Sequence, residues 1–272
     1  MIRALIIGAA AIALATPAIA QTSPSWTGLY VGGRIGYVKT PQKTSDSVLF
    51  DNNLDGQFGD TVRTASGVNA FSPGFCNGAG RTALAVDRCE TDNDGLTYGI
   101  HAGADYQFGQ IVVGGLVEYD RAKVENGVTA FTVTPASYTL TRELRGTLGA
   151  RARIGLDLQG TLPYLTAGIV RAKVRNSFST TNTVNAFAPN GGGRQSGYRL
   201  GGGFEQRVGP LSLGVLYLYT NVKDDDFRVN VTRGTAPATN AFVLTNPAGT
   251  QFRFSDKRFE THSANLTASY RF

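Results

Sequence analysis

Two histidines, His101 and His262, are the side chains of this sequence best suited to acid–base chemistry near neutral pH. Ser263 follows His262, but adjacent residues of a β-strand point to opposite faces, so the two cannot form a base–nucleophile pair. His101 shares a strand face with Asp105, and we interpret it as a hydrogen-bonding residue of the interior. The sequence also lacks a G-x-S-x-G nucleophile elbow. We therefore assign no catalytic residue and predict that the protein is not an enzyme.

Acidic residues gather in two places that could suit a metal ion. Residues 51–56, DNNLDG, match the first half of a calcium-binding loop, but Val62 stands at the twelfth position, where such a loop needs a bidentate Glu. We interpret 51–56 as a solvated turn and 224–226, DDD, as a solvated acidic tip. The alternative for the acidic tip is that it bridges divalent cations to lipopolysaccharide phosphates. No metal and no cofactor is predicted.

The first twenty residues have the pattern of a secretory signal peptide. Arg3 is their only charged side chain, an apolar run covers 4–15, and 18–20, AIA, has the small residues of a cleavage site. The apolar run is shorter than the roughly 18 residues that a membrane-spanning helix needs. We predict cleavage after Ala20, which leaves residues 21–272 as one exported domain.

The two cysteines of the sequence, Cys76 and Cys89, are separated by twelve residues. An exported chain meets an oxidising compartment, in which cysteines normally pair. No histidine lies near them and they do not form a CxxC motif, so a metal or redox pair is disfavoured. We predict a disulfide, whose closure of a short loop would contribute on the order of 3 kcal/mol to stability.

Eight segments of the chain alternate between apolar and polar residues. A period of two predicts strands, and a series of such segments predicts a β-barrel. The segments are residues 27–38, 95–108, 111–124, 141–156, 162–175, 196–208, 211–222 and 259–272.

The connections between these segments alternate in length. The short ones are 109–110, 157–161 and 209–210, and the long ones are 39–94, 125–140, 176–195 and 223–258. In a transmembrane barrel the short turns face the periplasm and the long loops face the outside. The predicted fold is therefore all-β, an eight-stranded antiparallel up-and-down transmembrane β-barrel with short periplasmic turns and long extracellular loops. We interpret the loops 176–195 and 223–258, rich in Asn, Thr, Ala and Gly, as mobile.

The two faces of the predicted strands differ in chemistry. One is apolar and rich in aromatic residues, as a lipid-facing wall would be, and the other is charged. Because charges cannot form a dry core unpaired, we predict a lumenal network of ion pairs. Its predicted members are Arg34, Asp105, Glu118, Asp120, Glu143, Arg145, Arg151, Arg153, Arg171, Lys173, Arg199, Glu205 and Arg207. An eight-stranded interior is just wide enough for side chains to fill, so no wide pore is expected. The alternative is a soluble sandwich with a solvated charged face.

Four stretches of the sequence resemble one known family. They are SWTGLYVGGRIGY (25–37), PYLTAG (163–168), LYLYT (216–220) and ASYRF (268–272). They are similar to the small outer-membrane immunogenic-protein or porin-family barrels of alphaproteobacteria, which are OmpA-like eight-stranded barrels. The resemblance implies an outer-membrane location and the roles given to such proteins, namely surface antigen, structural protein and porin. It also implies that Tyr270 and Phe272 belong to the strand signal that the barrel-assembly machinery reads.

These patterns predict an outer-membrane protein of a Gram-negative cell with a structural, surface-exposed role and at most limited porin-like diffusion of small solutes. The alternatives are a small porin with a slight anion preference, since Lys and Arg outnumber Asp and Glu in the predicted network, and a lipid-modifying enzyme. The expected partners are outer-membrane lipid, lipopolysaccharide and, during biogenesis, the barrel-assembly machinery. The net charge of +6 is spread along the strands, so no nucleic-acid partner is expected. The oligomeric state stays open.

Overall fold

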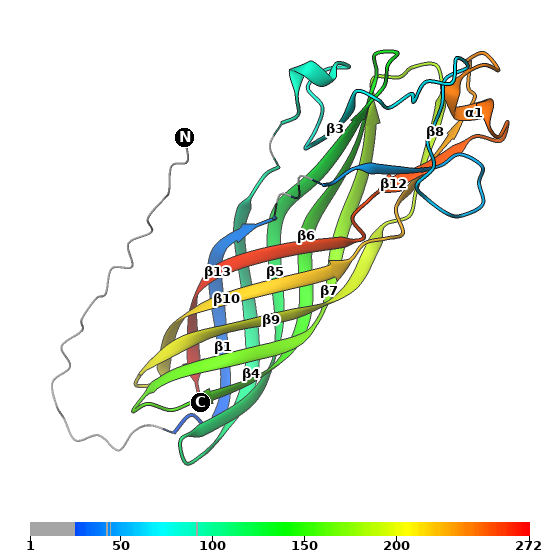
Figure 1. Ribbon diagram of the computed structural model, residues 1–272. Helices are drawn as coiled ribbons and strands as arrows, with labels where there is room; N and C mark the ends of the chain where they lie inside the picture. The colour runs from blue at the N-terminus through cyan, green and yellow to red at the C-terminus, as the bar shows by residue number, and fades with distance from the viewer. Residues whose placement is uncertain (1–24, 42, 44, 91) are drawn as a thin grey trace.

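A computed structural model describes residues 25–272 apart from 42, 44 and 91, and these residues form a closed β-barrel (Figure 1). Each barrel strand pairs antiparallel with its neighbours along the chain, and the first pairs with the last, so the sheet has no open edge. The eight barrel strands are β1 (Gly28–Lys39), β4 (Gly95–Phe108), β5 (Ile111–Phe131), β6 (Ser137–Leu156), β7 (Thr161–Thr180), β9 (Gly193–Val208), β10 (Leu211–Lys223) and β13 (Arg258–Arg271). The predicted fold class is confirmed. The predicted signal peptide lies outside the described residues.

The short connections lie together at one end of the barrel. The hairpin turns 109–110 and 209–210 join β4 to β5 and β9 to β10, and Gly109 and Gly209 have φ near +60°, which glycine adopts without strain. The chain also ends at this side, as the position of the C-terminus in Figure 1 shows. The opposite end carries all the long connections, in agreement with the prediction.

The long connections are ordered into a second sheet, and this corrects the interpretation of 176–195 and 223–258 as mobile loops. The sheet has the order β2-β12-β11-β8, and its strands come from three of the long connections. Its members are β2 (Val48–Asp51), β8 (Ala186–Asn190), β11 (Arg228–Thr232) and β12 (Thr250–Phe254), next to the short helix α1 (Ala241–Leu244). Strands β5, β6 and β7 reach beyond the barrel to meet it (Figure 1).

An aromatic core joins the second sheet to these strand extensions. Phe71 stacks on Phe50 with ring centroids 4.2 Å apart, and Tyr138 of β6 contacts Phe71, Phe242 and Phe252. All five rings are buried, and Phe252 is fully so. Burying an aromatic side chain is among the largest single contributions to stability, so this surface module has a core of its own. We call the second sheet, α1 and this core the surface module.

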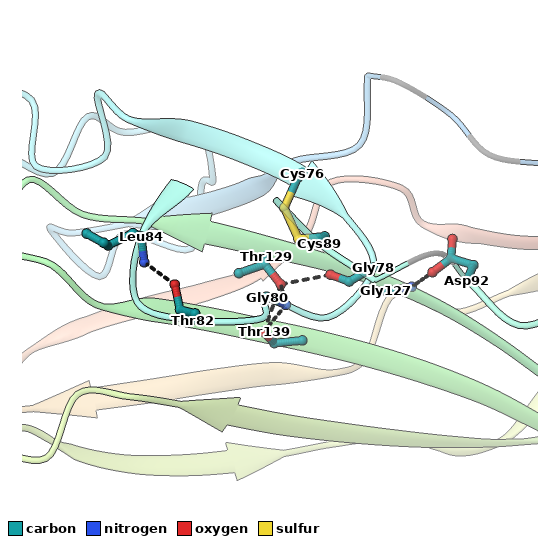
Figure 2. The surroundings of a disulfide bond; sticks show 10 residues. All are labelled: Cys76, Gly78, Gly80, Thr82, Leu84, Cys89, Asp92, Gly127, Thr129 and Thr139. Atoms are coloured by element: carbon teal, nitrogen blue, oxygen red, sulfur yellow. Dashed lines mark hydrogen bonds between the residues drawn. A yellow bond between two sulfur atoms is a disulfide. The ribbon is translucent and has the colours of Figure 1, made fainter. Parts of the chain in front are cut away.

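The predicted disulfide between Cys76 and Cys89 is present, and it fixes a loop against the side of β5 (Figure 2). Cys76 lies in β3 (Gly74–Asn77), which pairs with the extension of β5, and the loop returns through the short 3-10 helix η1 (Ala85–Asp87). The hydroxyl of Thr129 in β5 donates to the Gly78 carbonyl and accepts from the Gly80 N–H, each at 2.8 Å. The loop is therefore held by both the covalent bond and hydrogen bonds to β5.

The outer wall of the barrel is an apolar band. Large apolar side chains that a soluble protein would bury are exposed there at alternate positions, and a continuous exposed apolar surface of this kind marks contact with a membrane or partner. They include Leu29, Val31, Ile35, Leu96, Tyr98, Ile100, Tyr106, Val117, Leu148, Ile154, Leu165, Ile169, Leu200, Phe204, Leu213, Leu266 and Tyr270. Among the described residues, no helix is long and apolar enough to cross a membrane.

A β-bulge in β6 changes which side chains face inward. The register of β6 against β7 shifts between Leu144 and Gly146, so Arg145 is an extra residue. Towards the short turns, the odd-numbered Thr147 points inward. Towards the surface module, the even-numbered Arg142 and Leu144 point inward, because one extra residue moves every later side chain to the opposite face.

Candidate functional site in the barrel lumen

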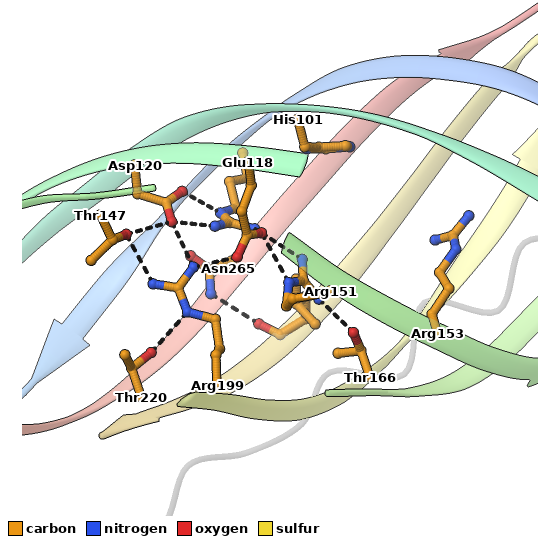
Figure 3. A network of polar contacts seen from close by, with 12 residues as sticks. His101, Glu118, Asp120, Thr147, Arg151, Arg153, Thr166, Arg199, Thr220 and Asn265 are labelled. Atoms are coloured by element: carbon orange, nitrogen blue, oxygen red, sulfur yellow. Dashed lines mark hydrogen bonds and ion pairs between the residues drawn. The ribbon is translucent and has the colours of Figure 1, made fainter. Parts of the chain in front are cut away.

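Two carboxylates hold the upper part of the lumenal network together (Figure 3). Glu118 of β5 accepts hydrogen bonds from Arg34 of β1 at 2.6 Å, from Arg151 of β6 at 2.8 Å and from Arg199 of β9 at 2.5 Å. Asp120, two residues along the same face, binds Arg34 and Arg199 as well. These side chains are almost fully buried, so the ion pairs cross the lumen from four strands without intervening bulk water.

A second group of charges forms the lower part of the network. Both oxygens of Asp105 accept from Arg153, and Arg271 donates to Asp105 at 2.5 Å. Glu205 accepts from Arg153 at 2.7 Å. The guanidinium groups of Arg153 and Arg271 each lie 4.7 Å from the ring centroid of Tyr30, a cation–π arrangement that further offsets their desolvation.

Glycines of the barrel wall make room for these carboxylates. A Cβ atom at Gly99 would overlap Oδ1 of Asp120, and one at Gly114 would overlap Oδ1 of Asp105. The carboxylates therefore lie flat against the neighbouring strand, where only glycine leaves the space.

Apolar plugs close the lumen above and below the network. At the end with the short turns, Trp26 is fully buried and its indole N–H donates to Asp157 at 3.0 Å. Above Asp120, the lumen is filled by a buried layer made of Val38, Val124, Leu144, Val170, Ala172, Val174, Val222 and Phe259. In the described part of the lumen, the cavity beside Arg34 and Asp120 has a volume of about 20 Å³, room for roughly one water molecule.

The match to a known family decides the identity of this fold. The sequence matches the family described as "Outer membrane protein beta-barrel domain" over residues 6–272. The chain belongs to this outer-membrane barrel family. A search of curated proteins found no match.

Solved structures similar to this outer-membrane barrel protein share little sequence with it. Neisserial surface protein A is 14% identical, with 90% of this chain and 98% of that chain covered and a TM-score of 0.37. Ail, the attachment invasion locus protein of Yersinia pestis, is 11% identical over 90% and 99%, with a TM-score of 0.29. The translocator domain of the autotransporter NalP from Neisseria meningitidis is 13% identical over 91% and 90%, also with a TM-score of 0.29.

The structure places most of the predicted lumenal residues inside this outer-membrane barrel. The buried ones are Arg34, Asp105, Glu118, Asp120, Arg151, Arg153, Arg199 and Glu205. Arg207 also faces inward, but it lies at the mouth beside Trp26, 6.0 Å from the indole ring, and binds the carbonyls of Ser25 and Gly209 rather than a carboxylate.

Four residues predicted in the lumen lie on the outer wall, and these predictions were wrong. Glu143 and Arg145 pair with each other at 2.8 Å outside the barrel, because the bulge at Arg145 reverses the faces of β6 above it. Arg171 and Lys173 are exposed, while Val170, Ala172 and Val174 point inward. The reason is that this part of β7 has left the apolar band, so its outer face meets water and its inner face belongs to the apolar plug.

Sequence reasoning missed three interior residues, Arg271, Trp26 and Arg142. Arg271 alternates with the outward Tyr270 and Phe272, so its parity alone could have placed it in the lumen. Trp26 precedes the first strand and carries no alternation signal. Arg142 lies above the bulge, which no local sequence feature announces.

His101 faces the lumen, as its parity suggests, but it does not contact Asp105. Its Nε2 lies 2.8 Å from the hydroxyl of Ser269 in β13, and its ring meets the edge of Tyr30. Asp105 is occupied by two arginines instead. His262 lies on the outer wall, where its Nδ1 is 2.5 Å from the hydroxyl of Tyr217. Among the described residues, neither histidine ring forms a hydrogen bond to a carboxylate.

A buried charged junction connects the barrel to the surface module. Arg142 lies over the ring of Phe254 at 3.9 Å, and its Nη1 donates to the Asp256 carbonyl at 3.0 Å. Burial raises the pKa of Asp46, which lies in the connection after β1, to about 6, with the nearby Asp256 adding to the effect. Burial also raises the pKa of Asp224, whose carboxylate is 3.9 Å from Arg142.

The two acidic motifs take part in hydrogen bonds and an ion pair within the structure. Asp224 is buried, so the prediction of a solvated tip at 224–226 holds at most for its neighbours. Asp51 is also buried, and its carboxylate accepts the backbone N–H groups of Asp55 and Gly56 at 3.2 and 2.9 Å, which closes the turn at 51–56. Within the described residues, no group of three or more His, Cys, Asp or Glu could hold a metal ion.

Proposed function

We propose that this protein is a closed outer-membrane scaffold that presents the surface module outside the cell and does not conduct solutes. The observation that carries this proposal is the filled lumen. Four carboxylates and five arginines interlock across it, and apolar plugs cover both ends. The arginines are Arg34, Arg151, Arg153, Arg199 and Arg271, and the carboxylates are Asp105, Glu118, Asp120 and Glu205.

The surface module supports the second half of the proposal. It has its own aromatic core, and it rests on the extensions of β5, β6 and β7, each of which is one strand with its part of the barrel wall. A module held this firmly suits a display or contact role better than a mobile loop does. The partner would meet the module or the rim of the barrel.

An anion-preferring porin is the rival, and bilayer recording separates the two. The purified wild-type protein should show no stable conductance steps at moderate voltage. A variant with Arg34→Ser, Arg151→Ser and Arg199→Ser removes three long side chains from the lumen and should leak cations, because Glu118 and Asp120 remain. Stable anion-selective steps from the wild-type protein would refute the closed scaffold.

We also propose that the protein has no enzymatic activity and that it reaches the membrane by export and assembly. Lipid A mass spectra should be the same with and without the gene, and a deletion-dependent change would make it an enzyme. Export should remove residues 1–20, which N-terminal sequencing of the membrane form would show as a start at Gln21. Tyr270→Ala together with Phe272→Ala should slow assembly, since Tyr270 is exposed on the final strand and Phe272 is exposed directly after it.

A further inference from the structure

Basic side chains gather on the outer wall where strands β5, β6, β7 and β9 leave the apolar band. All are exposed, and they project from four adjacent strands. We call this group the basic crescent, and it consists of Arg121, Lys123, Arg145, Arg171, Lys173, Arg175 and Arg194.

The strand register makes the crescent one continuous surface. Lys173 lies directly opposite Arg194, and both Lys173 and Arg121 pair with Gly146, from its two sides. Arg171, Lys173 and Arg175 occupy alternate positions of β7, so their side chains leave the same face at intervals of about 7 Å.

The charge of the crescent is largely unpaired. Arg145 has Glu143 as a partner, but among the described residues none of the other six forms an ion pair. Lys173 and Arg194 are like charges at directly opposed positions, an arrangement that destabilises a sheet. A bound anion between the two side chains would remove this repulsion.

The crescent lies at a defined height on the wall. Arg171 is opposite Leu148, which is 60% exposed on the apolar band, and Ile169 and Tyr198 lie directly below. The other end of the barrel differs, since its turns 109–110, 157–160 and 209–210 hold one charged residue, the buried Asp157. Cations therefore border the apolar band mainly at the end that carries the surface module.

We propose that the basic crescent binds the phosphate groups of a phosphorylated glycolipid in the outer leaflet. This inference rests on the proposed orientation, with the surface module outside. Headgroup phosphates lie at the edge of the hydrocarbon region, and Arg guanidinium groups bind phosphate through two parallel hydrogen bonds. One phosphate between Lys173 and Arg194 would neutralise the opposed charges, while the acyl chains of the same lipid lie on Leu148 and Ile169.

A lipid titration with two matched variants tests the proposal. The folded protein in neutral detergent micelles is titrated with a fluorescent diphosphorylated lipid A and with its dephosphorylated form. The crescent variant carries Arg171→Gln, Lys173→Gln, Arg175→Gln and Arg194→Gln. The control variant loses the same charge elsewhere on the rim, through Lys39→Gln, Lys223→Gln, Lys257→Gln and Arg258→Gln.

The wild-type protein should bind the diphosphorylated lipid at least tenfold more tightly than the dephosphorylated one, with an affinity that falls as salt is added. The crescent variant should lose at least tenfold in affinity and the control variant less than twofold. Equal losses in both variants, or equal binding of the two lipids, would overturn the proposal. All three proteins should keep the mobility shift between unheated and boiled samples, which shows a folded barrel. A failed lipid titration would not affect the prediction that the wild-type protein shows no conductance. It would therefore refute the basic crescent as a lipid site and not the closed scaffold.

Discussion

The indole N–H of Trp26 donates to Asp157 at 3.0 Å, across 131 positions of sequence, and so ties the segment before β1 to the turn that joins β6 to β7. Trp26 is the only tryptophan of the protein and is fully buried. Its fluorescence therefore reports on the lower plug alone. We expect slow quenching by acrylamide in the folded barrel, and Asp157→Asn should lower the unfolding free energy by about 1–2 kcal/mol through the weaker hydrogen bond. Quenching as fast as that of the urea-unfolded protein would mean that the lower plug is open.

Glu118 is the shared partner of three arginines, and Glu118→Gln should be strongly destabilising. The variant leaves Arg34, Arg151 and Arg199 with one carboxylate fewer in a buried space, which typically costs about 3–5 kcal/mol. Urea unfolding in detergent measures the loss. The control is Glu143→Gln, which removes an outer-wall pair and should cost less than about 1 kcal/mol. Similar losses for the two variants would show that the lumenal network adds little.

The raised pKa of Asp46 makes the surface module sensitive to pH. The pKa of Asp46 is higher in the folded than in the unfolded protein, so its charged form destabilises the folded state. This destabilisation is largest above the folded pKa of about 6. Asp46→Asn should thus stabilise the module by about 1 kcal/mol at pH 7.5, since Arg142 and solvent screen part of the charge, and should change nothing below pH 4. Near-ultraviolet circular dichroism of the aromatic core follows the transition.

The control for this pH effect is Asp225→Asn. Lys223 pairs with Asp225 at 2.9 Å and lowers the pKa of that carboxyl. This pKa shift is opposite in sign to that of Asp46, so Asp225→Asn should slightly lower the stability of the protein at pH 7.5. A gain in stability from both variants would point to general charge repulsion instead of the buried position of Asp46.

Loss of the disulfide should destabilise the loop that it closes and leave the barrel folded. Cys76→Ser with Cys89→Ser removes the closure of a loop with a sequence separation of 13, worth about 3 kcal/mol to the order of that loop. We expect faster proteolysis within 77–88, while the heat-dependent mobility shift is unchanged. Loss of that shift would mean that the disulfide is needed for the barrel itself.

Alternation predicted the fold and most of the lumen because the strands are regular within the apolar band. There, one face meets the apolar environment and the other is filled with paired charges, so Ile35 and Arg34 separate cleanly by parity. Above the band both conditions change. The bulge at Arg145 reverses β6, and the polarity of β7 inverts, so Val174 lies inside and Lys173 outside. A single rule for the whole strand could not place these residues.

The surface module was not predictable from local pattern. Its strands have four or five residues each, too few for alternation to be read against the background of a polar loop. Its pairings also join distant segments, as between Phe50 of β2 and Phe252 of β12. Only the complete fold brings these pieces together.

That distance along the chain has a consequence for the order of folding. β2 finds its partner β12 some two hundred positions later, and closing so long a loop costs less entropy once the intervening hairpins are in place. We therefore expect the surface module to be the last part of the molecule to form. Detection of the folded surface module on a cell would indicate that all the barrel strands beneath it have already paired in register.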